Sequence, residues 1–124
     1  MMVLCRRVIA DLLINVIGKR ANMEAFGVYD YKNAGSEAML RHPCLALVEI
    51  PEKYGFPALD TLDVCGEIKK SSPGCKIVLL CPENDRESVE TCVEVKKRDE
   101  IDDFLFYDSS VEYLASKLEA LCPA

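Results

Sequence analysis

The sequence predicts an α/β fold in which a parallel sheet is covered by helices on both faces. Short apolar segments alternate five times with segments of helical periodicity, and the connections between them are short. Two of the apolar segments, residues 44–50 and 75–81, are continuous rather than alternating, as in strands buried on both faces. Repeated strand–helix alternation favours parallel strands joined by right-handed crossovers.

The first two strand–helix pairs occupy the first third of the chain. Residues 2–5 predict a short strand and residues 6–20 a helix that ends near the cations after Gly18. The expected buried stripe of this helix comprises Val8, Ile9, Leu12, Leu13, Val16 and Ile17. Residues 24–30 predict a weaker strand, and residues 31–42 a modest helix.

The third pair combines the continuous strand at 44–50 with a helix over 57–70. The inward residues expected of this helix are Leu59, Leu62, Cys65 and Ile68. The strand at 75–81 follows the helix-breaking sequence SSPG, and the helix after it is expected over 84–97. These segments supply the predicted centre of the sheet.

The last strand is expected at residues 102–108 and the last helix at 109–122. The predicted buried stripe of that helix is Val111, Leu114, Leu118 and Leu121. Two helix starts carry the spacing of a capping box, Asn84 with Glu87 and Ser109 with Glu112. No linker or low-complexity tract interrupts the chain, so residues 1–124 are predicted to form a single domain.

Composition and charge limit the classes of function. The net charge of −6 argues against a nucleic-acid surface, which requires a basic patch, and leaves proteins or small molecules as partners. The apolar run over residues 8–18 contains Asp11 and Asn15 and is too short to span a bilayer. We therefore expect a cytoplasmic protein that does not associate with membranes.

Seven cysteines are spread along the chain without a C-x-x-C pair. Their odd number and apolar surroundings favour buried, reduced side chains in a reducing compartment. The single histidine, His42, precedes a strand and therefore belongs to the amino edge of the sheet. A metal site formed by sulfur and imidazole is not expected.

In parallel α/β sheets the functional site lies at the carboxyl ends of the strands. Here those ends bring residues of different charge to one edge. They are Cys5, Arg6 and Arg7 after the first strand, Asp30 after the second, Glu49 at the third, Cys81 at the fourth, and Tyr107 with Asp108 at the fifth.

From residue 43 onward the sequence resembles the receiver domain of bacterial two-component response regulators. The segment PCLALVEI resembles that family's P-D-L-V-L-L-D-I, and SPGCKIVLLC resembles S-P-x-x-K-V-I-L-L-T. The segments LDVCGEIKK, RESVETCVEV and DDFLFYDSSVEYLASKLEAL are similar to the family's later helices and last strand. The resemblance covers about two-thirds of the chain and implies a flavodoxin-like three-layer sandwich with strand order 2-1-3-4-5.

The resemblance also implies a phosphorylation site, from which this sequence departs at every position. Glu49 replaces the phosphorylated aspartate, Cys81 the threonine or serine, and Tyr107 the lysine. Arg6 and Arg7 fall about where an acidic pair would hold Mg²⁺. Because guanidinium groups repel a divalent cation, the magnesium site is predicted to be lost and no cofactor is expected.

Two roles for Glu49 remain open at this point. It either imitates a phosphoaspartate, neutralised by Arg6 or Arg7, or is a polar strand end paired with an arginine or with Lys53. The sequence predicts a degenerate receiver without enzymatic activity that signals through protein contact. The alternative is a divergent working receiver, phosphorylated on Glu49 or on Asp30.

Other chemistries at the same edge are disfavoured. A phosphocysteine at Cys5 would need a glycine- and serine-rich loop, and none occurs before Gly18. Flavin and dinucleotide sites also need a phosphate-binding loop after the first strand, which is missing. Predicted partners are a signalling protein or a second copy, bound through the face that carries Val89, Tyr107 and Tyr113 beside the charged segment 96–103.

Overall fold

Five parallel strands form one sheet in the order β2–β1–β3–β4–β5, as the sequence predicts. The strands are β1 (Met2–Val3), β2 (Gly27–Val28), β3 (Leu45–Glu49), β4 (Lys76–Cys81) and β5 (Asp103–Phe106). This computed structural model describes residues 1–4, 7–19, 24–51, 58–107 and 109–122.

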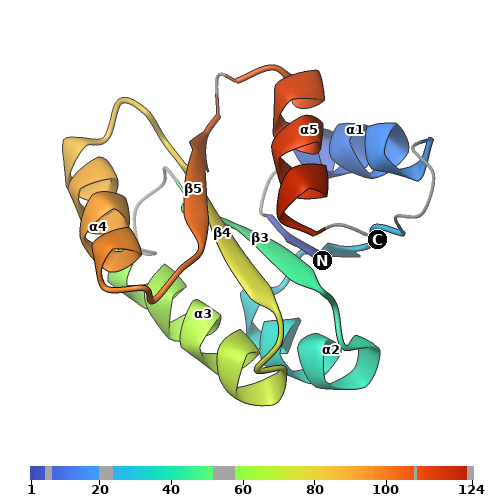
Figure 1. Cartoon of the computed structure of the whole chain (residues 1–124), viewed down its shortest axis with the longest axis horizontal. Coiled ribbons are helices and arrows are strands. Elements are labelled where there is room, and N and C mark those ends of the chain that lie inside the picture. The colour runs from blue at the N-terminus through green and yellow to red at the C-terminus, as the bar shows by residue number, and fades with distance from the viewer. Residues whose placement is uncertain (5–6, 20–23, 52–57, 108, 123–124) are drawn as a thin grey trace.

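Helices cover both faces of the sheet, giving the three layers expected of a flavodoxin-like fold. They are α1 (Arg7–Gly18), α2 (Ala34–Arg41), α3 (Ala58–Ser71), α4 (Arg86–Lys97) and α5 (Val111–Leu121), with a short 3-10 helix η1 (Tyr31–Asn33) before α2. Helices α1 and α5 pack side by side on one face, and α2, α3 and α4 lie on the other (Figure 1). Each predicted helix is present to within a few residues.

The core consists of two apolar layers, one on each face of the sheet. Along β3, Leu45 and Leu47 pack toward α1 and α5, whereas Ala46 and Val48 pack toward α2, α3 and α4. This division follows from the alternation of side chains along a strand. All five residues of β3 are buried, which confirms the interpretation of its continuous apolar sequence.

The predicted buried stripe of α1 is wrong at two positions. Val8 and Leu12 are 73% and 48% exposed, and the helix instead buries Ala10, Leu13 and Ile17. These three residues recur at i, i+3 and i+7, the spacing of one helix face. The apolar residues of α1 lie on so many sides of the helix that their periodicity did not show which side packs against the sheet.

The N-caps of α4 and α5 each lie one residue after the predicted position. The carboxylate of Asp85, not Asn84, accepts hydrogen bonds from the backbone nitrogen of Ser88 at 3.4 Å and from its hydroxyl at 2.7 Å. At α5, the hydroxyl oxygen of Ser110 accepts from the Tyr113 backbone nitrogen at 3.1 Å. Two adjacent candidate caps at each site made the sequence ambiguous.

The expectation that all cysteines are reduced is wrong for two of them. Cys44 and Cys122 form a disulfide that joins the start of β3 to the end of α5, with their Cα atoms 6.2 Å apart. Cys65, Cys75, Cys81 and Cys92 are free and buried, as predicted. Cys5 lies outside the described residues.

Two further expectations concern the surface. His42 is exposed at the end of α2, on the amino edge of the sheet, with a left-handed backbone. Among the residues that the structure describes, no helix has the length and apolar character needed to cross a membrane.

The cap assignment at α5 can be tested by substitution. Ser110→Ala removes the acceptor for the Tyr113 nitrogen and should lower the free energy of unfolding by about 1 kcal/mol. Ser109→Ala is the matched control and should change it by less than about 0.5 kcal/mol. Urea unfolding of both variants measures the difference, and equal losses would contradict the assignment.

Candidate functional site at the carboxyl edge of the sheet

Glu49, the acid at the strand-3 tip, is completely buried. It is the last residue of β3 and stands in register with Leu80 of β4. A buried carboxyl group requires hydrogen-bond partners, because its desolvation is otherwise costly. The side chains that supply these partners therefore define the site.

Tyr107 supplies the main contact with Glu49. Its hydroxyl group is hydrogen-bonded to Oε2 of Glu49 and lies 2.6 Å from the carbonyl oxygen of Ile50. Because a phenol carries one hydrogen, the two acceptors share it. The residue predicted at the lysine position of receiver domains thus meets the strand-3 acid with a hydroxyl group.

A second tyrosine, which the sequence analysis missed, binds the backbone at the same point. The hydroxyl of Tyr31 in η1 donates to the carbonyl oxygen of Glu49 at 2.6 Å. Tyr31 packs with the core layer of α2, α3 and α4, whereas Tyr107 packs with the layer of α1 and α5. The tip of β3 is therefore held from both sides of the sheet.

Cys81, the predicted switch-equivalent residue, lies on the other face from Glu49. Leu80 is the register partner of Glu49, so Cys81, one residue further, belongs to the layer that contains Cys92 of α4. A hydrogen bond from the Cys92 thiol lowers the pKa of Cys81, and the same bond together with burial raises the pKa of Cys92. The structure brings Glu49 and Tyr107 together and leaves Cys81 apart.

Arg7 does not serve as the counter-charge that was expected for Glu49. Its guanidinium group lies over the ring of Tyr29, 4.1 Å from the ring centroid, and the residue is exposed. The Tyr29 ring in turn lies against Gly27, where any larger side chain would collide with it. Arg6, Lys53 and Asp108 lie outside the described residues.

Asp30 is the acid that follows β2 at this edge. Asp30 is exposed, and its carboxylate accepts from the backbone nitrogen of Lys32 at 3.1 Å, capping η1. Among the described residues, no three histidine, cysteine or acidic side chains lie close enough to hold a metal ion.

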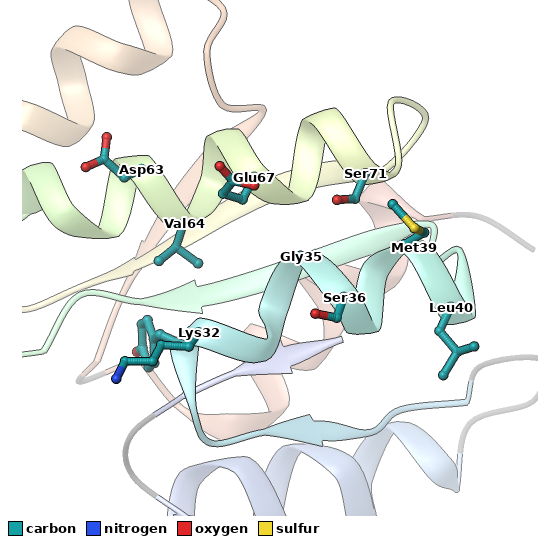
Figure 2. A pocket seen from close by; sticks show the side chains of 10 residues that line it. Lys32, Gly35, Ser36, Met39, Leu40, Asp63, Val64, Glu67 and Ser71 are labelled. Atoms are coloured by element: carbon teal, nitrogen blue, oxygen red, sulfur yellow. The ribbon is translucent and has the colours of Figure 1, made fainter.

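A separate groove of about 1030 Å³ lies between α2 and α3 (Figure 2). Lys32, Asp63 and Glu67 contribute charge to it, and Met39 and Leu40 are 60% and 75% exposed beside it. Gly35 of α2 faces Glu67 and Ser71 of α3, and a methyl group at this position would meet both at ordinary van der Waals distance. Tyr31 lines this groove and also binds the tip of β3.

Comparison with solved structures identifies the fold. A DNA-binding response regulator of the LuxR family from Staphylococcus aureus superimposes with a TM-score of 0.74 at 16% identity, covering 97% of this chain and 94% of that one. The signal receiver domain of a LuxO repressor protein from Vibrio parahaemolyticus gives 0.77 at 14% identity, over 98% and 86% of the two chains. The chain has the receiver-domain fold.

One of the similar structures carries an enzyme's name. A structure titled adenylate cyclase from Rhodopirellula baltica superimposes with a TM-score of 0.80 at 13% identity, covering 98% of this chain and 84% of that one. Neither a protein-family model nor a curated protein matches the sequence. At these identities the structural matches show the fold, and function must be argued from the site.

The contact between Tyr107 and Glu49 can be tested by removing one oxygen. Tyr107→Phe leaves the buried carboxyl group without this partner and should lower the free energy of unfolding by about 1–3 kcal/mol. Tyr113→Phe, at an exposed position, is the matched control and should change it by less than about 0.5 kcal/mol. The measurement is urea unfolding at neutral pH.

A double-mutant cycle separates this contact from a general effect of the ring. Combining Tyr107→Phe with Glu49→Gln should cost less than the sum of the two single substitutions, because both remove the same interaction. Strict additivity would contradict a direct contact.

Proposed function

We propose that the protein is a degenerate receiver that acts by contact with another protein and does not depend on phosphorylation. The observation that supports this most directly is the hydrogen bond between Tyr107 and Glu49. A working site of this kind needs a cation beside its acid. Here Tyr107, the residue predicted at the lysine position of receiver domains, meets the acid with an uncharged hydroxyl group.

The charges of the described residues around the strand-3 tip support the proposed loss of phosphotransfer. A phosphoryl group adds up to about two negative charges, which a buried site must neutralise. Arg7 is stacked on Tyr29, and tyrosine carries no positive charge at neutral pH. Attack by Glu49 on a phosphodonor would also require an exposed carboxylate, whereas Glu49 is buried. On these grounds we infer no magnesium site and no catalytic activity.

The carboxyl group of Glu49 favours a fixed conformation of this edge. It points inward and, with Tyr107, connects the tip of β3 to β5. The arrangement supports a constitutive state in which a buried carboxyl group takes the place of an added phosphate. A divergent receiver phosphorylated on the exposed Asp30 is the second candidate, although the cap of η1 engages that carboxylate.

The face formed by α4, β5 and α5 is the proposed contact surface. Tyr113 is 49% exposed on α5, and the ammonium group of Lys117 lies 5.9 Å from its ring centroid. Nearby, Lys96 pairs with Asp103 at 3.0 Å. An accessible aromatic ring among charged groups of both signs is a suitable anchor for a protein partner or a second copy in the cytoplasm.

The absence of a phosphate switch predicts the response to phosphate analogues. With Mg²⁺ and beryllofluoride, the amide NMR spectrum should show no shifts at residues 47–50, 79–82 and 103–107. A receiver of known activity in the same buffer is the positive control. Saturable shifts centred on Glu49 would contradict the proposal, and shifts centred on Asp30 would favour the second candidate.

If this face is the contact surface, removing the side chain of Tyr113 should weaken association. Tyr113→Ala should lower self-association or partner binding by roughly tenfold, since interface aromatics often contribute 1–2 kcal/mol or more. Val8→Ala, on the exposed side of α1, is the matched control and should leave association unchanged. Light scattering over a concentration series detects the homodimer, and equal effects of the two variants would contradict this surface.

A further inference from the structure

The disulfide joins two elements at the amino edge of the sheet, opposite the edge that carries Glu49. Cys44 directly precedes β3, and Cys122 caps the end of α5, 78 residues later. The two bonded residues differ in their surroundings. Cys44 is exposed, whereas Cys122 is only 7% exposed.

A cavity lies directly beside Cys44. Its volume is about 380 Å³, and Cys44, Glu24, Phe26, Arg41 and Leu118 are among the residues that line it. This volume is within the range of small-molecule sites. A ligand in the cavity would therefore contact Cys44, the more exposed residue of the disulfide.

Arg41 gives the cavity a group suited to an anion. The Nε atom of Arg41 donates to Glu37 at 3.0 Å, and its guanidinium group stacks 4.2 Å from the centroid of the Phe26 ring. This arrangement fixes the plane of the guanidinium group while its terminal nitrogens remain able to bind a carboxylate. Glu24 on the same cavity suits an ammonium group.

We propose that this cavity is a site of thiol–disulfide exchange between the Cys44–Cys122 bond and a small peptide-like thiol that carries both carboxylate and ammonium groups. The thiolate attacks the sulfur of Cys44, a mixed disulfide forms there, and Cys122 leaves as a thiolate. A second thiolate then attacks the mixed disulfide and releases the oxidised small-molecule disulfide and the Cys44 thiolate. Two thiols are oxidised and one protein disulfide is reduced.

The structure also indicates what exchange changes in the protein. Leu114, Ala115 and Leu118 hold the body of α5 against the sheet independently of the disulfide. Opening the bond therefore releases the end of α5 and leaves the sheet packed. The inference does not rest on the proposed function, because it concerns the opposite edge.

Glutathione is a probe of the required chemistry, and the full chain can be equilibrated in buffers of increasing reduced-to-oxidised ratio. Alkylation, peptide mass mapping and circular dichroism then report the bond, the modified residue and the fold. We expect reversible opening, a mixed disulfide on Cys44, and no modification of the four buried free cysteines while the protein stays folded. A disulfide that persists at every ratio, never forms, or opens only on unfolding would overturn the proposal, as would a mixed disulfide on Cys122.

The rate of exchange tests the role of the cavity. Arg41→Ala should slow opening by glutathione roughly three- to tenfold while leaving opening by uncharged 2-mercaptoethanol unchanged. Lys32→Ala, an exposed cation outside this cavity, is the matched control and should have no effect on either rate. Equal slowing with both thiols would show that Arg41 only supports the local structure and would overturn its role in recognition.

Discussion

The burial of one carboxyl group governs the carboxyl edge of this sheet. Glu49 ends a strand that is inaccessible on both faces, so its carboxyl group must find partners inside the protein. Tyr107 meets the side chain, and Tyr31 binds the backbone carbonyl of the same residue. A lysine at position 107 would bring a charge suited to a phosphoryl group, whereas a tyrosine brings a short, neutral donor suited to the carboxyl group itself. The hydroxyl group of Tyr107 is therefore suited to binding the carboxyl group of Glu49.

The parallel sheet and its layers of helices were predictable because they depend on patterns that a single sequence contains, whereas the strand order came from the resemblance to receiver domains. Continuous apolar runs identified β3 and β4, and alternation with helices required parallel connections. The predictions were wrong where two residues adjacent in sequence had side chains suited to the same role. The buried side of α1 and the caps at Asp85 and Ser110 are of this kind, since packing rather than propensity decides between adjacent residues.

The site was less predictable than the fold, for a geometric reason. Resemblance placed Glu49, Cys81 and Tyr107 at one edge, but a shift of one residue along a strand reverses the face. Cys81 therefore points toward α4, away from Glu49. Tyr31 gave no signal, because its contact joins a 3-10 helix to a strand tip through a backbone atom. The disulfide was equally hidden, since its cysteines are far apart in sequence and only the fold brings them together.

Both ends of β3 are connected to the C-terminal part of the chain, which includes Tyr107 and α5. At its carboxyl end, Glu49 is hydrogen-bonded to Tyr107, which follows β5; at its amino end, Cys44 is covalently bonded to Cys122, which ends α5. The chain is therefore held to the central strand at Tyr107, before α5, by a hydrogen bond, and at Cys122, after α5, by a disulfide that is sensitive to redox state. Opening the disulfide leaves the Tyr107 contact as the remaining fixed end, and the change is then greatest at the end of α5. Because Tyr113 lies near the start of α5, close to the intact end, its surface should keep its position in either redox state.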